Sequence, residues 1–244
     1  MKNRNVLISG GSGHIGKPLV SALLDRGARV FNMSSRKSGI QHSSLFEYCV
    51  DLEEDGEAAD AFKWLGNTMV GGLDGIVCLA SRASKGIRIS MSGNQFMEEM
   101  RESIKPVVNV ISNSISLLNS ESSIVLTGSA WGKLSPRPEV YLDLNNEPSL
   151  ALVAAKAATE QYGKYLSVLL ASKKIRVNIL TPGWFPAKRG PQRDDYISSI
   201  CRNVPMGRIG LPDELVMGYL YLLGTGASYV TGQTLVIDGG YSAI

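Results

Sequence analysis

The stretch VLISGGSGHIGKPLVSALLDRG, residues 6–27, sets the expectation for the whole fold. Its first residues, VLIS, form a short and mostly apolar run, which is typical of a buried parallel strand. Ile15, Leu19 and Leu23 then repeat at helical spacing, and Gly27 follows as a residue that commonly ends a helix. We therefore expect a strand, a glycine turn and an amphipathic helix in succession.

The rest of the chain repeats this alternation of apolar runs and amphipathic segments. Further strands are expected at 28–34, 45–51, 72–80, 122–129, 174–183 and 234–240, and helices within 96–118, from Ser149 onward and at 212–223. Such alternation predicts right-handed βαβ units. The expected fold is α/β, a Rossmann-type doubly wound parallel sheet of seven strands with helices on both faces. No linker or repeat interrupts the 244 residues, so a single domain over 1–244 is expected.

Composition excludes several classes of protein. Hydrophobic residues make up 44% and charged residues 19%, which is an ordinary globular mixture. A net charge of only +3 disfavours a nucleic-acid binder, and no apolar run approaches the roughly 18 residues of a membrane span. The start of the chain does not resemble a signal peptide. Cys49, Cys78 and Cys201 lack metal-ligand spacing, which predicts reduced thiols in the cytoplasm and no metal site.

Glycines at positions 10, 13 and 16 form a G-x-x-G-x-x-G turn between the first strand and its helix. Such a turn lets the backbone approach a pyrophosphate, and the helix N-terminus adds free amides and a positive dipole end. Cofactor contacts are expected from Gly10, Ser12, Gly13, His14, Ile15 and Gly16. The alternative is a tight turn without a ligand.

The end of the second strand indicates the type of dinucleotide. An acidic residue there binds the ribose hydroxyls of NAD, whereas a basic residue accepts the 2′-phosphate of NADP. The sequence reads Ser34, Ser35, Arg36, Lys37 and contains no acid. It therefore favours NADP(H) over NAD(H), with Ser35 and Arg36 as contacts. The alternative is that Arg36 and Lys37 form a solvated loop.

The C-terminal third carries the strongest resemblance to a known family. RVNILTPG at 176–183, VPMGRIGLPDEL at 204–215 and YVTGQTLVIDGG at 229–240 resemble segments of short-chain dehydrogenases/reductases. The likeness extends over essentially the whole chain. It implies oxidation or reduction of a small molecule with a nicotinamide cofactor.

The resemblance also assigns cofactor contacts beyond the glycine turn. Asp51 and Leu52 match the family's Asp-hydrophobic pair, which contacts adenine. Ala80 lies at the expected end of the fourth strand, and Pro182 and Gly183 match the turn beside the nicotinamide. These positions complete the expected dinucleotide site.

The resemblance is incomplete at the catalytic residues. Ser129 matches the family's active-site serine and Lys156 the lysine of its Tyr-x-x-x-Lys motif. In the family the tyrosine exchanges the proton while the lysine lowers its pKa and binds the ribose. Leu152 stands at the tyrosine position, and none of the nine tyrosines has a lysine four residues later. The family's asparagine aligns with Ser103.

Two glycine-associated motifs also differ from the family. Residues 78–81 read Cys-Leu-Ala-Ser where members have Asn-Asn-Ala-Gly, and His14 replaces the middle glycine of the turn. The turn's spacing is closer to that of extended members, which keeps cofactor binding as the expectation.

An insert at about 133–150 offers a replacement acid. It carries Tyr141, Asp143 and Glu147, and a phenol from Tyr141 near Lys156 would restore the same chemistry. The alternative is that Tyr141 packs the loop. The insert resembles that of members acting on sugars or other polyhydroxylated metabolites.

Three other sources of the proton remain open. Lys156 is the first, because burial near an apolar residue and a nicotinamide cation lowers a lysine pKa. Ser129 is a weak second donor. Water or a substrate hydroxyl is the third.

Residues at about 184–205 are expected to form a substrate lid. Trp184 and Phe185 offer an apolar wall. Lys188, Arg189 and Arg193 either meet an anionic substrate or belong to a solvated loop. The helix from Ser149 is apolar on more than one face, and in the family this helix packs against a partner, which implies a homodimer or homotetramer.

Three functions remain open at this point. The first is an NADP(H)-dependent oxidoreductase acting on a carbonyl or alcohol with an unusual proton donor. The second is a non-redox enzyme, such as an isomerase or dehydratase, that uses Lys156 and Ser129. The third is an inactive binding protein that keeps the dinucleotide fold.

Overall fold

A computed structural model describes residues 1–81, 91–137, 140, 149–186 and 194–244. Within these residues seven parallel strands form one sheet in the order β3-β2-β1-β4-β5-β6-β7. The strands are β1 Asn5–Ser9, β2 Arg29–Ser34, β3 Leu45–Cys49, β4 Leu73–Cys78, β5 Leu118–Thr127, β6 Arg176–Pro182 and β7 Thr234–Ile237. The expected doubly wound fold is confirmed.

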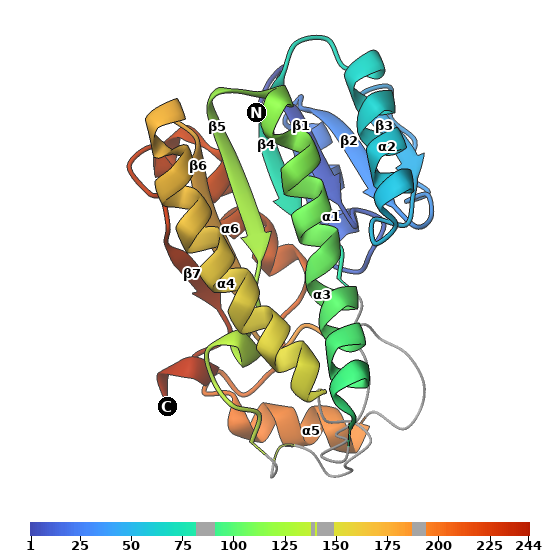
Figure 1. Cartoon of the computed structure of the whole chain (residues 1–244). Helices are drawn as coiled ribbons and strands as arrows, with labels where there is room; N and C mark the ends of the chain where they lie inside the picture. Colours follow the sequence, from blue (N-terminus) through green and yellow to red (C-terminus); the bar gives the residue numbers. More distant parts are fainter. Residues whose placement is uncertain (82–90, 138–139, 141–148, 187–193) are drawn as a thin grey trace.

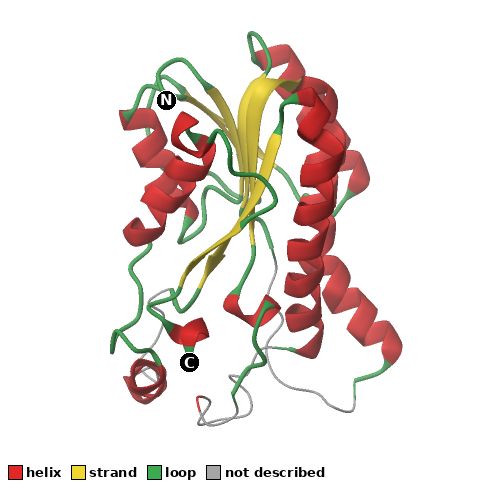
Figure 2. Cartoon of the chain, turned by 90° about the vertical axis from the view of Figure 1, so that its left-hand side faces the viewer, coloured by secondary structure: helices red, strands yellow, loops and turns green. Residues whose placement is uncertain are grey.

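Helices cover both faces of this sheet (Figure 2). They are α1 Gly16–Asp25, α2 Asp55–Thr68, α3 Gly93–Ser114, α4 Leu150–Leu170, α5 Asp194–Asn203 and α6 Asp213–Leu223. One apolar cluster joins the sheet to α2, α3 and α4, and a second joins it to α1 and α6. The inner strands β1, β2, β4 and β6 are therefore largely buried from both sides, whereas the edge strands β3 and β7 are only partly buried.

The sequence analysis missed α2. Its segment DGEAADAFKWLGNT buries Ala58, Ala61, Phe62 and Leu65, so half of its core face consists of small side chains. The segment also contains two glycines, which weaken helical propensity. Packing against α3 and the sheet stabilises a helix whose own pattern is faint.

Element ends differ modestly from the expectations. Gly27 does close α1: it has φ +74° and donates its N–H to the carbonyl of Leu24. The helical region expected to reach residue 118 ends at Ser114, a short 3₁₀ turn follows, and β5 starts directly at Leu118. The start of β5 pairs with Leu73 of β4 ahead of a register irregularity, which adds residues that the apolar pattern did not reveal.

The topology places the site. The chain reverses its winding direction between β1 and β4, and ligands of such sheets bind at the carboxyl ends of the strands near this point. Helix α5 and the N-terminal ends of α3 and α4 lie at this same end of the molecule (Figure 1). Within the described residues, none of the helices has the length and apolar character needed to span a bilayer.

Candidate cofactor and substrate site

A cleft of about 260 Å³ opens at the carboxyl ends of β1, β2, β3 and β4. Its walls come from five separate segments of the sequence, four that follow strands and one in α3, which only the tertiary fold brings together. The lining residues are Gly10, Ser12, Gly13, Ser34, Ser35, Arg36, Val50, Asp51, Leu52, Glu53, Leu79, Ala80, Ser81 and Pro106. We name this hollow the nucleotide cleft.

Two positions of the glycine turn, 10 and 16, have no room for a larger residue. Gly10 has φ +78°, and a Cβ there would lie 2.8 Å from the amide nitrogen of Ala80. A Cβ on Gly16 would lie 2.5 Å from the carbonyl oxygen of Gly10. The turn therefore folds tightly on its own backbone. Ile15 makes no side-chain cap hydrogen bond to α1. In the first turn the amide of Lys17 donates to the carbonyl of Gly13 at 3.1 Å and Pro18 has no N–H, so the amide of Gly16 is the first-turn donor that faces a phosphate bound at this turn.

A buried polar network fixes this turn to the end of β2. The amide of Asn32 donates to Ser12 Oγ and to Glu47 Oε1, both at 2.9 Å. Ser34 Oγ donates to Asn32 Oδ1 at 2.8 Å and accepts from the backbone amide of Ser12 at 3.2 Å. The network joins the phosphate-binding turn to the segment that would meet the adenosine ribose.

Glu47 anchors the loop that carries Arg36. Its carboxylate accepts the backbone amide of Ser38 at 2.8 Å in addition to the Asn32 amide. Burial opposes ionisation of Glu47, but these hydrogen bonds and the charge of Lys37 hold its pKa below the ordinary value. Sequence reasoning missed Asn32 and Glu47, although polar residues in strands are a usable signal of such a network.

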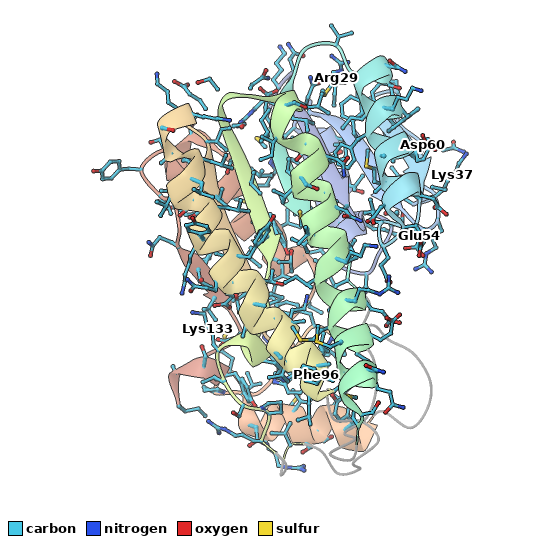
Figure 3. The ribbon with its side chains drawn as sticks, in the orientation of Figure 1. Arg29, Lys37, Glu54, Asp60, Phe96 and Lys133 are labelled. Atoms are coloured by element: carbon cyan, nitrogen blue, oxygen red, sulfur yellow. The ribbon has the colours of Figure 1, made fainter. Side chains whose placement is uncertain are left out.

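Arg36 and Lys37 occupy different surroundings. Arg36 lines the rim of the nucleotide cleft, next to Ser34 and Ser35. Lys37 is exposed and projects from the outer edge of the molecule (Figure 3). Among the described lining residues Arg36 is the one cation.

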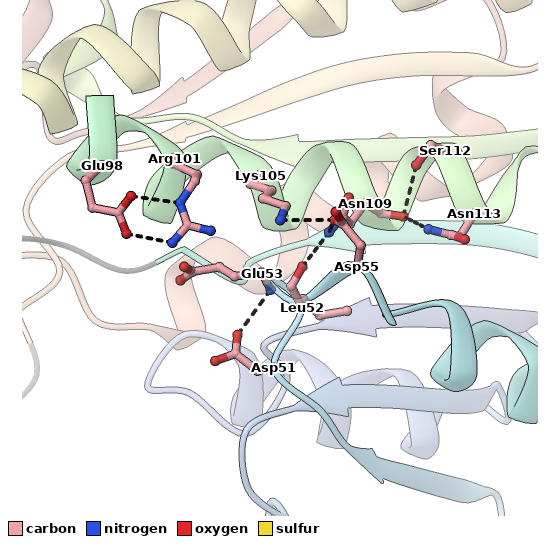
Figure 4. Close-up of polar contacts among 10 residues, drawn as sticks. All are labelled: Asp51, Leu52, Glu53, Asp55, Glu98, Arg101, Lys105, Asn109, Ser112 and Asn113. Carbon is pink, nitrogen blue, oxygen red and sulfur yellow. Dashed lines mark hydrogen bonds and ion pairs between the residues drawn. The ribbon is translucent and has the colours of Figure 1, made fainter. Parts of the chain in front are cut away.

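Helix α3 holds the Asp51–Leu52 turn from the other side (Figure 4). The Asn109 amide donates to the carbonyl of Leu52 and to Asp55 Oδ1, both at 3.0 Å, and Lys105 Nζ lies 3.1 Å from the same Asp55 oxygen. The Asp51 carboxylate itself accepts the backbone amide of Glu53 at 3.1 Å. The turn is thus fixed at the wall of the nucleotide cleft.

The tyrosine position is apolar and buried. Leu152 is 4% exposed, and its backbone amide donates to Ser149 Oγ, which caps the N-terminus of α4 at 3.0 Å. The side chain of Leu152 has no proton to exchange. Ser103, at the asparagine position, is also buried in α3.

Lys156 reaches toward the nucleotide cleft. Its Nζ donates to Ser81 Oγ at 3.3 Å, and Ser81 lines that cleft at the end of β4. Burial lowers the pKa of Lys156 to about 8. The ammonium group of Lys156 therefore lies beside the wall of the nucleotide cleft, and its surroundings disfavour its charge.

A second hollow of about 210 Å³ has aromatic walls, and we name it the substrate cleft. It is lined by Ser129, Ala130, Trp131, Gly183, Trp184, Phe185, Pro186 and Tyr196. The rings of Trp131 and Trp184 meet edge to face at 5.5 Å, and those of Trp184 and Tyr196 at 6.1 Å. Trp184 and Phe185, the two residues expected to form an apolar wall, both line this cleft.

Glu160 links segments that lead into the substrate cleft. It lies one helical turn after Lys156 on α4 and is 5% exposed. Its Oε1 accepts from Thr181 Oγ1 at 3.0 Å, and its Oε2 lies 3.6 Å from Lys133 Nζ. Figure 3 shows Lys133 beside α4. One carboxylate thus connects the lysine helix, the segment after Ser129 and the strand that ends in Pro182.

The remaining expected residues fall in several places. Gly183 lines the substrate cleft, and Pro182 ends β6 opposite Ile237 of β7. His14 is exposed on the glycine turn and, like Ile15 and Gly16, does not line the nucleotide cleft. Tyr141, Asp143, Glu147, Lys188, Arg189 and Arg193 lie outside the described residues.

Sequence reasoning missed two of the aromatic residues that line the substrate cleft, Trp131 and Tyr196. Trp131 follows the serine by two residues, and Tyr196 lies on α5 inside the expected lid. Both were visible as aromatic residues close to motif positions. In the part of the chain that the structure describes, no group of three His, Cys, Asp or Glu side chains is arranged to hold a metal ion.

The dinucleotide site fits the residues present. The glycine turn leaves backbone room at the N-terminus of α1, Arg36 lies at the end of β2, and Lys156 contacts Ser81 at the end of β4. The two clefts share the carboxyl edge of the sheet. A dinucleotide bound along this edge would present its nicotinamide near Ser129 and Gly183.

Known proteins share this architecture. A family model described as enoyl-(acyl carrier protein) reductase matches residues 13–242. The 3-oxoacyl-[acyl-carrier-protein] reductase FabG of Chlamydia muridarum is 27% identical over 98% of this chain and 97% of its own. The sorbose reductase of Candida albicans is 35% identical, over 51% of this chain and 42% of its own.

A solved structure agrees with these relatives. The short-chain dehydrogenase of Leptospira borgpetersenii, crystallised with bound NAD⁺, superposes with a TM-score of 0.89 and 26% identity over 99% of this chain and 94% of its own. The FabG reductase and the Leptospira dehydrogenase thus match this chain over nearly the whole length of both chains. This chain belongs to the short-chain dehydrogenase/reductase family of enzymes.

Proposed function

We propose that the protein is an NADP(H)-dependent oxidoreductase that interconverts a carbonyl and an alcohol on a small molecule. The observation that carries this proposal is the nucleotide cleft, whose walls combine the glycine turn, Arg36 and the Asp51–Leu52 turn. Family membership supports the redox chemistry. Bound NADPH would supply the hydride.

The residues of the chain have separate roles in this proposal. The turn at Gly10–Gly16 and the N-terminus of α1 bind the pyrophosphate. Lys156 holds the nicotinamide ribose with Ser81, and Pro182–Gly183 borders the nicotinamide. Ser129 donates a hydrogen bond to the substrate oxygen in the substrate cleft, which polarises the carbonyl.

NADP(H) is favoured over NAD(H) by Arg36 at the cleft rim. The segment Ser34–Lys37 contains no carboxylate to bind ribose hydroxyls. The Leptospira relative holds NAD⁺, so family membership alone does not decide the cofactor. The cationic rim of this chain supports the 2′-phosphorylated form.

A fluorescence titration tests the cofactor proposal. Energy transfer from Trp131 and Trp184 to the nicotinamide reports binding of NADPH and NADH. We expect micromolar binding, tighter for NADPH. Arg36→Ala should reduce the preference about tenfold, which corresponds to about 1.4 kcal/mol. Lys37→Ala is the matched control, because this neighbouring cation does not line the cleft. Equal preference in wild type and Arg36→Ala would refute the assignment.

The aromatic substrate cleft supports a compact carbonyl substrate. Trp131, Trp184 and Phe185 present flat apolar faces, and Ser129 is the polar group beside them. Relatives include a 3-oxoacyl reductase and a sorbose reductase. We favour a polyhydroxylated metabolite, whose C–H faces pack on indole rings. A panel of ketoses and 3-oxoacyl thioesters, assayed by NADPH oxidation, distinguishes the two classes.

An inactive binding protein is the second candidate. Leu152 and Ser103 replace two of the family's four catalytic side chains, and this double loss is the observation that favours it. Such a protein would bind NADPH without turnover in any substrate panel. Gain of carbonyl reduction in Leu152→Tyr, with none in wild type, would support it. A non-redox enzyme using Lys156 and Ser129 would instead convert substrate without a change in NADPH absorbance.

We also propose a homodimer or homotetramer in the cytoplasm. Helix α4 exposes large apolar side chains at Leu150, Tyr165, Val168 and Leu169. An apolar helix face of this size indicates a partner surface. Light scattering of the purified protein tests it, and Val168→Asp should shift the mass toward the monomer.

A further inference from the structure

We propose that Tyr196 of α5 is the acid that protonates the substrate oxygen, in place of the tyrosine that Leu152 replaces. This inference rests on the proposed oxidoreductase function. It assigns the lid a catalytic side chain, whereas the motif position on α4 carries none.

The lining of the substrate cleft singles out Tyr196. Ser129 and Tyr196 border the same hollow, together with Gly183 of the nicotinamide turn. Among the described lining residues Tyr196 is the one phenol, and no carboxyl, imidazole or ammonium group accompanies it. A phenol is the group that the family's reaction uses, and a serine hydroxyl alone is a far weaker acid.

Packing holds this phenol at the cleft. The ring of Tyr196 meets the edge of Trp184 at 6.1 Å with an interplanar angle of 80°. Trp184 is 8% exposed and belongs to an apolar cluster with Ile200 of α5, and Tyr196 packs against this cluster. These contacts hold the half-buried ring of Tyr196 at the cleft, and a catalytic acid requires such a fixed position.

The two groups on α4 are directed elsewhere. Leu152 is buried and apolar, and Lys156 donates to Ser81 on the nucleotide side. Neither residue lines the substrate cleft. In this proposal Lys156 binds the ribose of the cofactor, and Tyr196 of the lid transfers the proton.

The proposed step couples a hydride transfer to a proton transfer. The carbonyl carbon accepts a hydride, with its electron pair, from the reduced nicotinamide, which is thereby oxidised. The O–H bond of Tyr196 breaks, and its proton forms a new O–H bond on the carbonyl oxygen. The resulting phenolate takes a proton from water. In the reverse direction the phenolate accepts the proton of the alcohol.

The first test compares three variants that each remove one phenol oxygen. Tyr196→Phe should lower kcat for carbonyl reduction about 100-fold while the Kd for NADPH stays unchanged. Tyr229→Phe is the control, because this tyrosine is fully exposed between α6 and β7. Tyr141→Phe tests the insert. Full activity in Tyr196→Phe, or the large loss in Tyr141→Phe instead, would overturn the assignment.

A second readout does not depend on turnover. Protein labelled with ¹³C at the tyrosine ζ-carbon gives one resonance per tyrosine, and Tyr196→Phe identifies the resonance of residue 196. We expect this resonance to shift when NADP⁺ is added, since the oxidised nicotinamide carries a positive charge, and the resonance of Tyr229 to stay in place. An unshifted Tyr196 resonance at saturating NADP⁺ would overturn the proposal.

A rescue experiment separates this inference from the proposed function. Adding Leu152→Tyr to Tyr196→Phe should restore part of the lost turnover, because a phenol returns beside Lys156. If wild type has no turnover but Leu152→Tyr does, the native cleft holds no donor and Tyr196 is excluded. If neither protein binds NADPH, the oxidoreductase function itself fails.

Discussion

The nucleotide cleft and the substrate cleft share one edge of the sheet but differ in how they are held. The nucleotide side is fixed by backbone turns and by the buried network of Ser12, Asn32, Ser34 and Glu47. The substrate side is formed by aromatic rings from three segments, joined through Trp184. The first depends on hydrogen-bond geometry and the second on packing.

This difference separates two kinds of constraint. A pyrophosphate is recognised by backbone amides, so the glycine turn tolerates almost no change. Proton transfer requires only an acid within reach of the substrate oxygen, and several elements border that place. Leu152 can therefore replace the tyrosine of α4 while the nucleotide side keeps its motifs.

The largest effect is expected in the glycine turn. Gly16→Ala places a Cβ 2.5 Å from the Gly10 oxygen and 2.6 Å from the Gly11 Cα, where only backbone can move. We expect a loss of about 4 kcal/mol in the free energy of unfolding and no measurable NADPH binding. Urea unfolding and the fluorescence titration measure both. Retained binding would show that this turn does not contact the cofactor.

Lys156 lies at the junction of the two clefts. Below pH 8 the folded and unfolded chains both carry its ammonium, so the folded state bears the desolvation cost. Between pH 8 and the ordinary value of 10.5 only the unfolded chain keeps the proton, so stability rises with pH. Lys156→Met should abolish this rise and stabilise the protein at pH 7 by about 3 kcal/mol, while weakening NADPH binding about tenfold. Urea unfolding at pH 7 and pH 10, with Lys164→Met as the surface control, checks the prediction. Equal pH dependence in Lys156→Met and wild type would contradict it.

Glu160 supports the substrate side. Glu160→Ala removes a buried carboxylate and leaves the Thr181 hydroxyl, which is 0% exposed, without its acceptor. We expect a destabilisation of about 2 kcal/mol, and about 1 kcal/mol for Thr181→Val, which removes the hydrogen bond alone. The double variant should lose less than the sum of the single effects. Strict additivity would mean that the two side chains act independently.

The smallest effect is expected at Gly66, near the C-terminal end of α2. A Cβ at Gly66 meets no atom within 4 Å, and the residue lies inside the helix. Gly66→Ala should stabilise the protein by about 0.5–1 kcal/mol and leave NADPH binding unchanged. Thermal unfolding measures the gain. A weaker cofactor affinity in this variant would imply that α2 contributes to the nucleotide side.

Much of the fold was predictable because each element carries a local signal. The run at 6–9, the glycines at 10, 13 and 16 and the repeat of Leu19 and Leu23 indicate strand, turn and helix without tertiary information. Helix α2 was not predictable, since its buried face is half alanine and its stability comes from packing. Trp184 and Phe185 were expected at the substrate side, but the walls from Trp131 and Tyr196 were missed, because these residues are far apart in the chain.

By itself the sequence determined the parallel sheet, the glycine turn, the cationic residue after β2 and the absence of tyrosine at position 152. These are local facts of residue type and spacing. Only the tertiary structure decided that Lys156 faces Ser81, that Glu160 joins Thr181 to Lys133, and that Tyr196 shares a cleft with Ser129. The physical reason is that strand order and helix packing bring together side chains whose separation along the chain gives no sign of contact.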